Sequence, residues 1–262
     1  MRFIATAAII GALLCAAPAS AQIGTQEPSS KAKLNDPGTV PLPIRWHVIV
    51  WGSGGLDLDV IGNVTTGAIG TIRGTQMLVD TTAFPDVYVK TPRRYSVGLG
   101  LGVFDQTELF VRYSETNNPA STVLIGRFGS NDNLFAVAFD NYRERTIEGG
   151  LRHYMGASLH FREYFALNGG LKTVQPISLN LQAPGGAVPA RLYNLSKVPT
   201  LGLDFGVQIE FRHIGLFLEA GARYQKRLVR EDGDLTNYGL EDLNNSGIRL
   251  FMPVQTGLYF RF

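Results

Sequence analysis

The sequence is almost without cysteine. Its 262 residues contain a single one, Cys15, which lies in an apolar run close to the N-terminus. Once that run is removed, the chain can form neither a disulfide nor a thiolate metal site. The residue before Cys15 is Leu14, whereas lipid attachment at such a cysteine calls for a small residue there. We therefore do not expect a lipoprotein.

The chain also lacks a strong imbalance of charge. It has 24 Lys and Arg residues against 22 Asp and Glu residues, which gives a formal net charge of +2. A chain so close to neutrality has no net basic field that would attract a polyanion. Nucleic acid is therefore not an expected partner.

Long apolar runs are missing everywhere except at the N-terminus. A basic start, an apolar run over residues 3–17 and a small-x-small motif at residues 19–21 predict a cleaved secretory signal peptide of residues 1–21. Residues 22–43 are polar, contain proline and predict a flexible leader. After residue 22 no apolar stretch reaches the ~20 residues that a membrane-spanning helix needs. If this exported chain crosses a membrane, it must do so with closed β-strands, because an open sheet would leave backbone groups unpaired in lipid.

What the sequence does have is strict alternation, most clearly at its C-terminal end. A strand projects successive side chains to opposite faces, so residues 248–262 predict one apolar and one mostly polar face. The first face carries Ile248, Leu250, Met252, Val254, Thr256, Leu258, Phe260 and Phe262, and the second carries Arg249, Phe251, Pro253, Gln255, Gly257, Tyr259 and Arg261.

The last residues also carry a recognisable motif. Gln255, Gly257, Phe260 and Phe262 give a polar residue, a glycine, a hydrophobic residue and a terminal aromatic. This pattern resembles the C-terminal assembly signal of bacterial outer-membrane barrels. The apolar face of the strand would then contact lipid and the polar face would line the lumen.

Similar alternation predicts eight strands, at residues 44–52, 94–104, 107–114, 145–155, 159–172, 200–212, 215–225 and 248–262. The connections between them are alternately short and long, as in an all-β, antiparallel up-and-down transmembrane barrel with short periplasmic turns and long extracellular loops. Residues 44–262 would form this barrel. Residues 60–72, 86–89 and 134–139 could be strand extensions above the membrane, or an extra hairpin that makes ten strands.

Residues 94–104 and 148–154, together with the C-terminal motif, resemble the OmpA-type small outer-membrane barrels of Gram-negative bacteria. The resemblance implies a place in the cell outer membrane, among its lipid and lipopolysaccharide, with the leader in the periplasm. It also implies periplasmic chaperones and the barrel-assembly machinery as partners during biogenesis. Because the chain ends on its last strand, no peptidoglycan-binding domain is expected.

The predicted inward faces hold many charges of both signs. Eight strands leave an interior just wide enough for side chains, and unpaired charges there would lose hydration without compensation. The pattern favours a salt-bridged lumen network, and a gated path for small solutes is the alternative. The residues are Glu108, Arg112, Glu148, Arg152, Asp204, Glu210, Arg212, Glu219, Arg223, Arg249 and Arg261.

The glycines of the second strand alternate with its apolar residues. Gly98, Gly100 and Gly102 fall on the inward face, where they would make room for bulky lumen side chains of neighbouring strands. They are not a nucleotide-binding loop, because they lie within a strand and no helix follows them.

Catalytic groups are scarce. Outer-membrane acyltransferases, deacylases and proteases use histidine with serine or aspartate near the outer mouth of the barrel. The histidines here, His47, His153, His160 and His213, all fall toward the periplasmic rim of the predicted topology. We therefore expect no enzyme, and the sequence indicates no cofactor and no metal site.

The acidic residues of the last long connection form the remaining group. Residues 231–234 and 241–242 could hold a divalent cation among lipopolysaccharide phosphates, but they lack calcium-loop spacing and favour a solvated face. The sequence thus predicts a structural or surface barrel with a largely closed lumen. A narrow porin or transporter for small solutes is the alternative, and an envelope enzyme comes third. No extracellular ligand can be named.

Overall fold

The computed structural model describes residues 44–88, 92–129, 133–155, 161–183, 186–211, 213–231 and 233–262. The predicted signal peptide and leader lie outside these ranges, as do Arg212 and His160.

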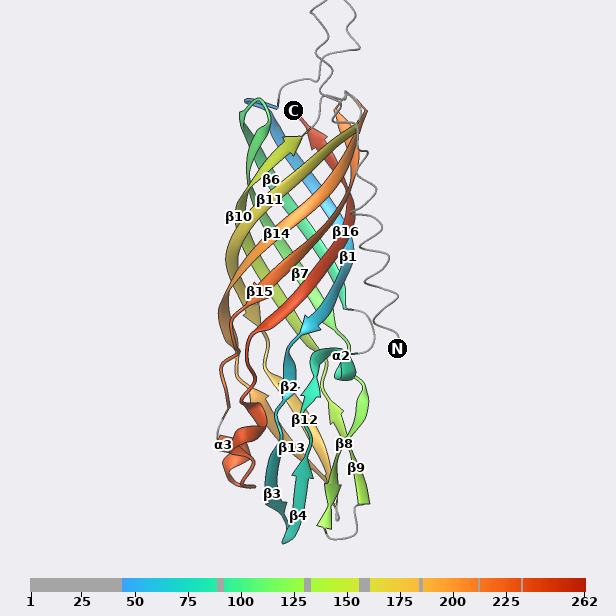
Figure 1. Cartoon of the computed structure of the whole chain (residues 1–262), viewed down its shortest axis with the longest axis vertical. Coiled ribbons are helices and arrows are strands. Elements are labelled where there is room, and N and C mark those ends of the chain that lie inside the picture. The colour runs from blue at the N-terminus through green and yellow to red at the C-terminus, as the bar shows by residue number, and fades with distance from the viewer. Residues whose placement is uncertain are drawn as a thin grey trace, which may run out of the picture. The chain divides into compact units, whose positions relative to one another are not determined.

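In the described part of the chain, eight antiparallel strands close into a barrel (Figure 1). The eight-stranded prediction is confirmed, and the ten-stranded alternative is not realised. Around the ring the strands follow the order β1, β16, β15, β14, β11, β10, β7, β6. Their bounds are β1 Val48–Ile61, β6 Arg93–Phe104, β7 Thr107–Asn118, β10 Tyr142–Met155, β11 Phe161–Val174, β14 Ser196–Phe211, β15 Ile214–Gln225 and β16 Arg249–Arg261.

The first strand closes the ring by pairing on both sides. Val50 lies opposite Phe260 of β16 and opposite Leu99 of β6, so neither side of β1 is left as an open edge. The strand runs nine residues beyond its predicted end at residue 52, to Ile61. Glycines had hidden this extension by interrupting the apolar pattern. One of them, Gly55, lies so close to β16 that a Cβ there would be 2.2 Å from the Val254 carbonyl oxygen.

Three of the connections are short in sequence. The strand ends that they join, Phe104 and Thr107, Met155 and Phe161, and Phe211 and Ile214, lie at the end of the barrel that also carries the C-terminus (Figure 1). We call this the turn end. The four long connections lie at the opposite end, and we call their described residues within 62–88, 119–141, 175–195 and 226–248 the cap. They were predicted to be long loops, with possible strand extensions or an extra hairpin at residues 60–72, 86–89 and 134–139. Strands do form at Ala68–Ile72 and Asn133–Phe139, but they pair in a separate sheet and do not enter the barrel. These are therefore neither simple loops nor an additional barrel hairpin.

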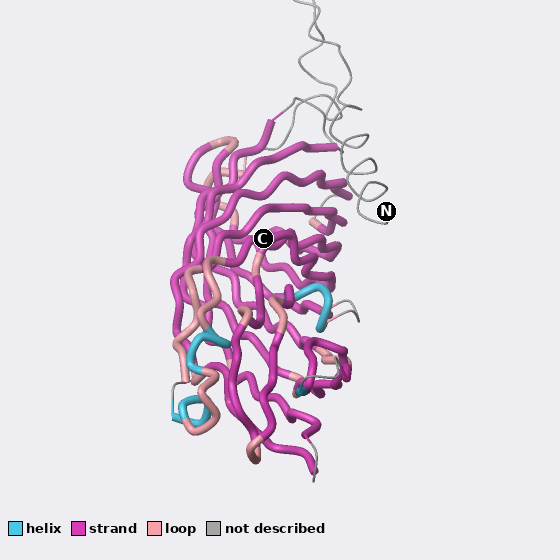
Figure 2. Tube along the Cα trace, turned by 60° about the horizontal axis from the view of Figure 1, so that its bottom comes forward, coloured by secondary structure: helices cyan, strands magenta, loops and turns pink. Residues whose placement is uncertain are grey.

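The cap consists mostly of strands (magenta in Figure 2). Six of them form one sheet with the order β13, β12, β9, β8, β4, β3. Its strands are β3 Ala68–Ile72, β4 Thr75–Val79, β8 Thr122–Phe128, β9 Asn133–Phe139, β12 Ile177–Ala183 and β13 Gly186–Tyr193. Short elements accompany it: β2 Asn63–Thr65 paired with β5 Thr82–Ala83, α2 Phe84–Val87, α3 Gly233–Thr236 and the 3₁₀ turn η2 Glu241–Asn244. Among the described residues, no helix is long and apolar enough to span a membrane.

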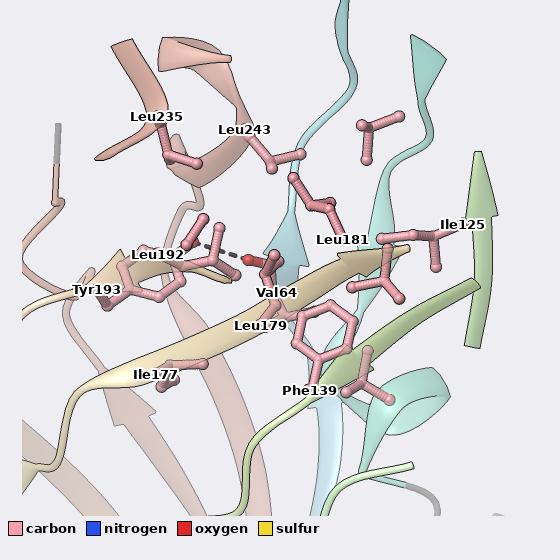
Figure 3. Packing of buried hydrophobic residues seen from close by; sticks show 14 of the residues in the cluster. Val64, Ile125, Phe139, Ile177, Leu179, Leu181, Leu192, Tyr193, Leu235 and Leu243 are labelled. Carbon is pink, nitrogen blue, oxygen red and sulfur yellow. Dashed lines mark hydrogen bonds between the residues drawn. The ribbon is translucent and has the colours of Figure 1, made fainter. Parts of the chain in front are cut away.

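The cap has its own apolar core. Val64, Leu179, Leu181 and Leu192 are fully buried and pack in one cluster, as Figure 3 shows. The Tyr193 hydroxyl donates a hydrogen bond of 3.0 Å to the Val64 carbonyl within this cluster. Burial raises the pKa of Tyr193 to about 12.

The last long connection joins the two outer strands of the cap sheet. The Thr71 amide of β3 donates to the Tyr238 carbonyl at 2.8 Å, and the Glu231 amide donates to the Leu192 carbonyl of β13 at 3.0 Å. The described parts of this connection around Glu231 and Tyr238 therefore contact the two outer strands and pair with backbone groups of them.

Candidate functional site

The outward face of the barrel is an apolar belt. On β6 the outward residues Val97 and Leu99 are 59% and 56% exposed, and on β14 Leu201 is 63% exposed. An apolar surface this continuous is typical of contact with lipid, since water would disfavour it. Further outward residues of the belt are Val50, Leu101, Leu109, Val111, Ile147, Leu151, Leu167, Leu171, Leu203, Phe205, Leu216, Leu218 and Leu258.

The lumen holds a cluster of charges at its centre. Arg112 donates to Glu148 at 2.8 Å, to Asp204 at 3.2 Å and to Glu219 at 2.6 Å. Arg223 donates to Glu148 at 3.0 Å and to Asp204 at 2.7 Å. All five side chains are almost completely buried. Two guanidiniums are thus surrounded by three carboxylates.

This central cluster crosses the full width of the barrel. Arg112 belongs to β7 and Glu219 to β15, and in the ring order these strands are fourth neighbours in either direction. Two strands so placed face each other across the lumen of an eight-stranded barrel. The 2.6 Å ion pair between Arg112 and Glu219 therefore bridges opposite walls at this level.

Nearer the turn end, a second layer is built around Arg152. Its guanidinium lies 3.3 Å from Glu108 and 3.4 Å from Glu219, and its carbon Cζ is 4.7 Å from the ring centre of Tyr164. The Tyr154 hydroxyl donates to Glu108 at 2.7 Å. The aromatic rings fill space around the cation, so this layer is packed as well as paired.

At the turn end itself, Glu210 lies between two arginines. One oxygen forms an ion pair with Arg261, and the other lies 3.6 Å from Arg162. Glu210 and Arg261 were both predicted to face inward, and both side chains are only 3% exposed.

The lumen is crossed again where the barrel meets the cap. Arg249 donates to both oxygens of Asp59, at 2.6 and 3.1 Å, and forms an ion pair with Glu144. Arg249 is on β16 and Glu144 on β10, which are also fourth neighbours around the ring. The ring of Phe84, from α2 of the cap, lies 4.6 Å from the guanidinium carbon. Lys172 completes the cluster at 2.7 Å from Glu144.

Six charged residues of the lumen were not predicted from the sequence. They are Asp57, Asp59, Arg94, Glu144, Arg162 and Lys172. For three of them the signal was present, since Arg94, Arg162 and Lys172 alternate in phase with the predicted inward residues of their strands. Glu144 fell one residue before a predicted strand, and Asp57 and Asp59 fell in a predicted loop.

With these six residues included, the described part of the lumen holds eight basic and eight acidic side chains. The basic ones are Arg94, Arg112, Arg152, Arg162, Lys172, Arg223, Arg249 and Arg261, and the acidic ones are Asp57, Asp59, Glu108, Glu144, Glu148, Asp204, Glu210 and Glu219.

The inward glycines of β6 make room for this filling, as predicted. A Cβ on Gly98 would lie 2.2 Å from the Trp51 ring of β1, and one on Gly100 would lie 2.0 Å from a carboxylate oxygen of Glu108 on β7. Bulky or charged side chains of the two neighbouring strands therefore lie directly over glycine.

The residues of the C-terminal motif divide between the two faces of β16. Gln255 points into the lumen, where its amide nitrogen donates to Glu219 at 2.5 Å. Gly257 lies against β1, since a Cβ there would be 2.2 Å from the Gly52 carbonyl oxygen. Phe260 and Phe262 expose their side chains on the outside. The backbone of Phe262 pairs with Val48, which leaves its ring free for another contact.

The described histidines lie at the turn end. His47 is 2.9 Å through Nδ1 from the Phe262 carbonyl oxygen, His153 is 3.0 Å through Nδ1 from the Thr107 hydroxyl, and His213 lies in the turn before β15. Within the described residues, no three His, Cys, Asp or Glu side chains are grouped to hold a metal ion.

Comparison with protein-family models and with curated proteins finds no match. Among solved structures, the chain is similar to Neisserial surface protein A, with 10% identity, a TM-score of 0.45 and coverage of 82% of this chain and 97% of that one. It is also similar to Ail, the attachment invasion locus protein of Yersinia pestis (10% identity, TM-score 0.41, coverage 84% and 100%). A third similar structure is the outer-membrane protease OmpT of Escherichia coli, with 11% identity, a TM-score of 0.45 and coverage of 82% of this chain and 97% of that one.

The ring of strands and its apolar belt decide the class of this protein. The fold is an eight-stranded transmembrane β-barrel. Its inside and outside are reversed relative to a soluble barrel, because lipid contacts the apolar belt and charged side chains fill the interior.

The reversal ends where the cap begins. Lys172 is the last buried charge of β11, whereas the buried residues of β12 are Ile177, Leu179 and Leu181. Pro176 lies between the two strands and has no amide hydrogen to donate to a ladder. The buried face changes from even to odd residue numbers at this break. The cap thus has an apolar interior, as expected for a part of the protein surrounded by water.

Proposed function

We propose that the protein is an integral protein of the cell outer membrane with a structural or surface role and a lumen closed to steady solute flow. In this proposal residues 1–21 direct export and are cleaved, and residues 22–43 remain in the periplasm. The turn end faces the periplasm and the cap faces the outside. Periplasmic chaperones and the barrel-assembly machinery deliver the chain, and outer-membrane lipid and lipopolysaccharide surround it.

The observation that carries the closed lumen is the pair of ion bridges between opposite walls. Arg112 meets Glu219 across the middle of the barrel, and Arg249 meets Glu144 across the end beneath the cap. A continuous column of water wide enough for a sugar would require both bridges to open together.

Opening even one bridge is costly. Opposite charges at contact distance attract by several kcal/mol in a poorly hydrated interior, and leaving one partner buried alone costs about 3–5 kcal/mol. The bridging residues also share further partners, so Arg112 could leave Glu219 only by distorting its contacts with Glu148 and Asp204. These couplings support a resting state that is closed.

The cap supports both parts of the proposal. Its apolar core lies beyond the last lumen charges, and Phe84 of the cap contacts Arg249 of the lumen. A permeating ion would meet this packed apolar cluster after leaving the charged lumen. A folded sheet at the outer surface also suits a role in presenting a defined surface, which long loops without structure would not provide.

Single-channel recording of the refolded protein in planar bilayers tests this function. We expect no steady conductance and at most small, brief openings. A large and stable conductance from the unmodified protein would contradict the closed lumen and would favour a narrow porin or transporter instead.

A further inference from the structure

An open pocket lies on the outer surface of the barrel, where its strands approach the cap. Its lining includes Leu56 of β1, Arg93 and Tyr95 of β6, Asn117 of β7 and Arg143 of β10. These residues are outside the lumen network, and the proposed closed barrel does not use them.

Strand register places two arginines on either side of an amide in this pocket. Arg93 lies opposite Asn117, and Asn117 lies opposite Arg143 on the next strand. Side chains paired in this way have Cβ atoms about 5 Å apart. Arg93 and Arg143 are exposed, whereas the Asn117 side-chain oxygen is buried and has no hydrogen-bond partner among the described atoms. The pocket therefore offers guanidinium donors around an amide.

The charges next to the pocket leave it basic. Glu115 lies 3.8 Å from Arg143 and 3.3 Å from Arg145, and the two arginines are more than half exposed. Together with Arg93, three arginines face a single carboxylate, which leaves two net positive charges. One carboxylate cannot occupy all the donors of three guanidiniums, since each has five N–H groups.

The pocket also lies at the border of the apolar belt. Along β6 the outward residues change from Arg93 to Tyr95 and then to Val97, and along β10 they change from Arg145 to Ile147. A succession of charged, aromatic and aliphatic side chains is typical of a membrane interface. A ligand in the pocket could thus keep an anionic head beside the arginines and an apolar tail on the belt.

We propose that this pocket binds the phosphorylated sugar headgroup of a membrane lipid. Arg93 and Arg143 would bind phosphate oxygens, for which the planar guanidinium is well suited. Asn117 would donate a hydrogen bond from its amide nitrogen to a sugar hydroxyl, and Tyr95 and Leu56 would contact the start of the acyl chains. This site rests on the proposed membrane placement, with the cap facing the leaflet that contains such a lipid.

Binding to the full-length protein refolded in detergent micelles tests the site. The probes are bisphosphorylated lipid A, the same lipid without its phosphates, and inorganic pyrophosphate. We expect the double variant R93Q/R143Q to bind bisphosphorylated lipid A at least about tenfold more weakly than the unmodified protein. The control R191Q removes one exposed arginine of the cap, distant in sequence and strand from the pocket, and should change the affinity less than twofold.

Three results would overturn the proposal. They are equal affinity of the unmodified protein for the lipid with and without phosphates, unchanged affinity in R93Q/R143Q, and binding of pyrophosphate as tight as that of lipid A. The last result would indicate a site for free phosphate rather than for a lipid. Heat-modifiable mobility on gels checks that the variants fold. If a variant does not fold, the comparison of the two lipids on the unmodified protein still tests the proposal.

The failure of this site can be told apart from the failure of the proposed function. Conductance reports on the lumen alone, and membrane fractionation reports on localisation. A protein that is closed and located in the outer membrane but indifferent to lipid phosphate would contradict only the pocket.

Discussion

Replacing Glu219 with alanine should destabilise the barrel more than any exposed glutamate-to-alanine change. The carboxylate is 2% exposed and accepts from Arg112 at 2.6 Å, from Arg152 at 3.4 Å and from the Tyr164 hydroxyl at 3.0 Å. The amide of Gln255 donates to it as well. Its removal takes a shared acceptor from four donors on four different strands and opens the bridge between opposite walls.

The expected loss lies at the low end of the range for a broken buried pair. Such losses run to about 3–5 kcal/mol, because the remaining charge stays buried without its partner. Here Arg112 keeps Glu148 and Asp204, and Arg152 keeps Glu108 at 3.3 Å. We therefore expect the free energy of unfolding to fall by about 3 kcal/mol.

Glu115→Ala is the matched control. Glu115 also pairs with two arginines, but its side chain is 27% exposed and both arginines are more than half exposed. Surface pairs of this kind contribute about 0–1 kcal/mol. Urea unfolding in lipid vesicles measures both variants. A loss in Glu219→Ala no larger than that in Glu115→Ala would refute the view that the lumen network is a tightly coupled unit.

The same variants should differ in planar bilayers. Removing Glu219, or Glu148 in a parallel experiment, takes one ion-pair partner from Arg112 and so weakens the hold on its side chain. Brief openings should therefore become more frequent. Glu115→Ala leaves the lumen intact and should record like the unmodified protein. Equal opening frequencies in all of these proteins would contradict the assignment of closure to the ion bridges.

Three further predictions concern other parts of the molecule. Arginine scanning of residues 201–211 on β14 should give alternating stability losses in bilayers. The loss should be about 2–4 kcal/mol where lipid-facing Leu203 and Val207 are replaced, and smaller at lumen-facing Gln208. A loss that does not alternate along the strand would contradict one lipid-facing and one lumen-facing side. Deleting Phe262, whose ring is exposed, should lower outer-membrane levels and raise periplasmic degradation while refolding in detergent stays largely intact, and unchanged surface levels would exclude an assembly role. Burial raises the pKa of Tyr193 from 10.0 to about 12, so its contribution to cap stability is complete below pH 10 and is lost as the pH rises through 12, because the unfolded phenol ionises first. Unfolding of Tyr193→Phe, measured over this interval, should depend less steeply on pH than unfolding of the unmodified protein.

The sequence alone was sufficient for the barrel because lipid imposes a local pattern. A strand with lipid on one side and a polar lumen on the other must alternate at every second residue, and β14 and β16 do so for most of their lengths. The same alternation within each strand placed Glu108, Arg112, Asp204 and Glu219 on the inward face, where the structure also has them. The strand ends were harder to predict, since β1 continues through glycines that carry no hydropathy signal.

The cap could not be predicted as a domain. Its strands are short, and water surrounds it, so its buried residues follow the ordinary rule of apolar inside and polar outside. At Pro176 the buried face changes both its parity and its polarity. The alternation typical of barrel strands is therefore missing here, and these segments were predicted to be loops, although Ile177 and Leu179 belong to a packed core.

The pairing of the lumen charges was decided by tertiary structure alone. Arg112 and Glu219 are separated by 107 positions in the chain and meet because eight strands with a particular stagger close into one ring. Alternation is a property of each strand by itself and says only that a side chain points inward. Which inward charge meets which depends on the ring order and on the register between strands, and a one-residue slip in a single strand would turn its charges toward lipid.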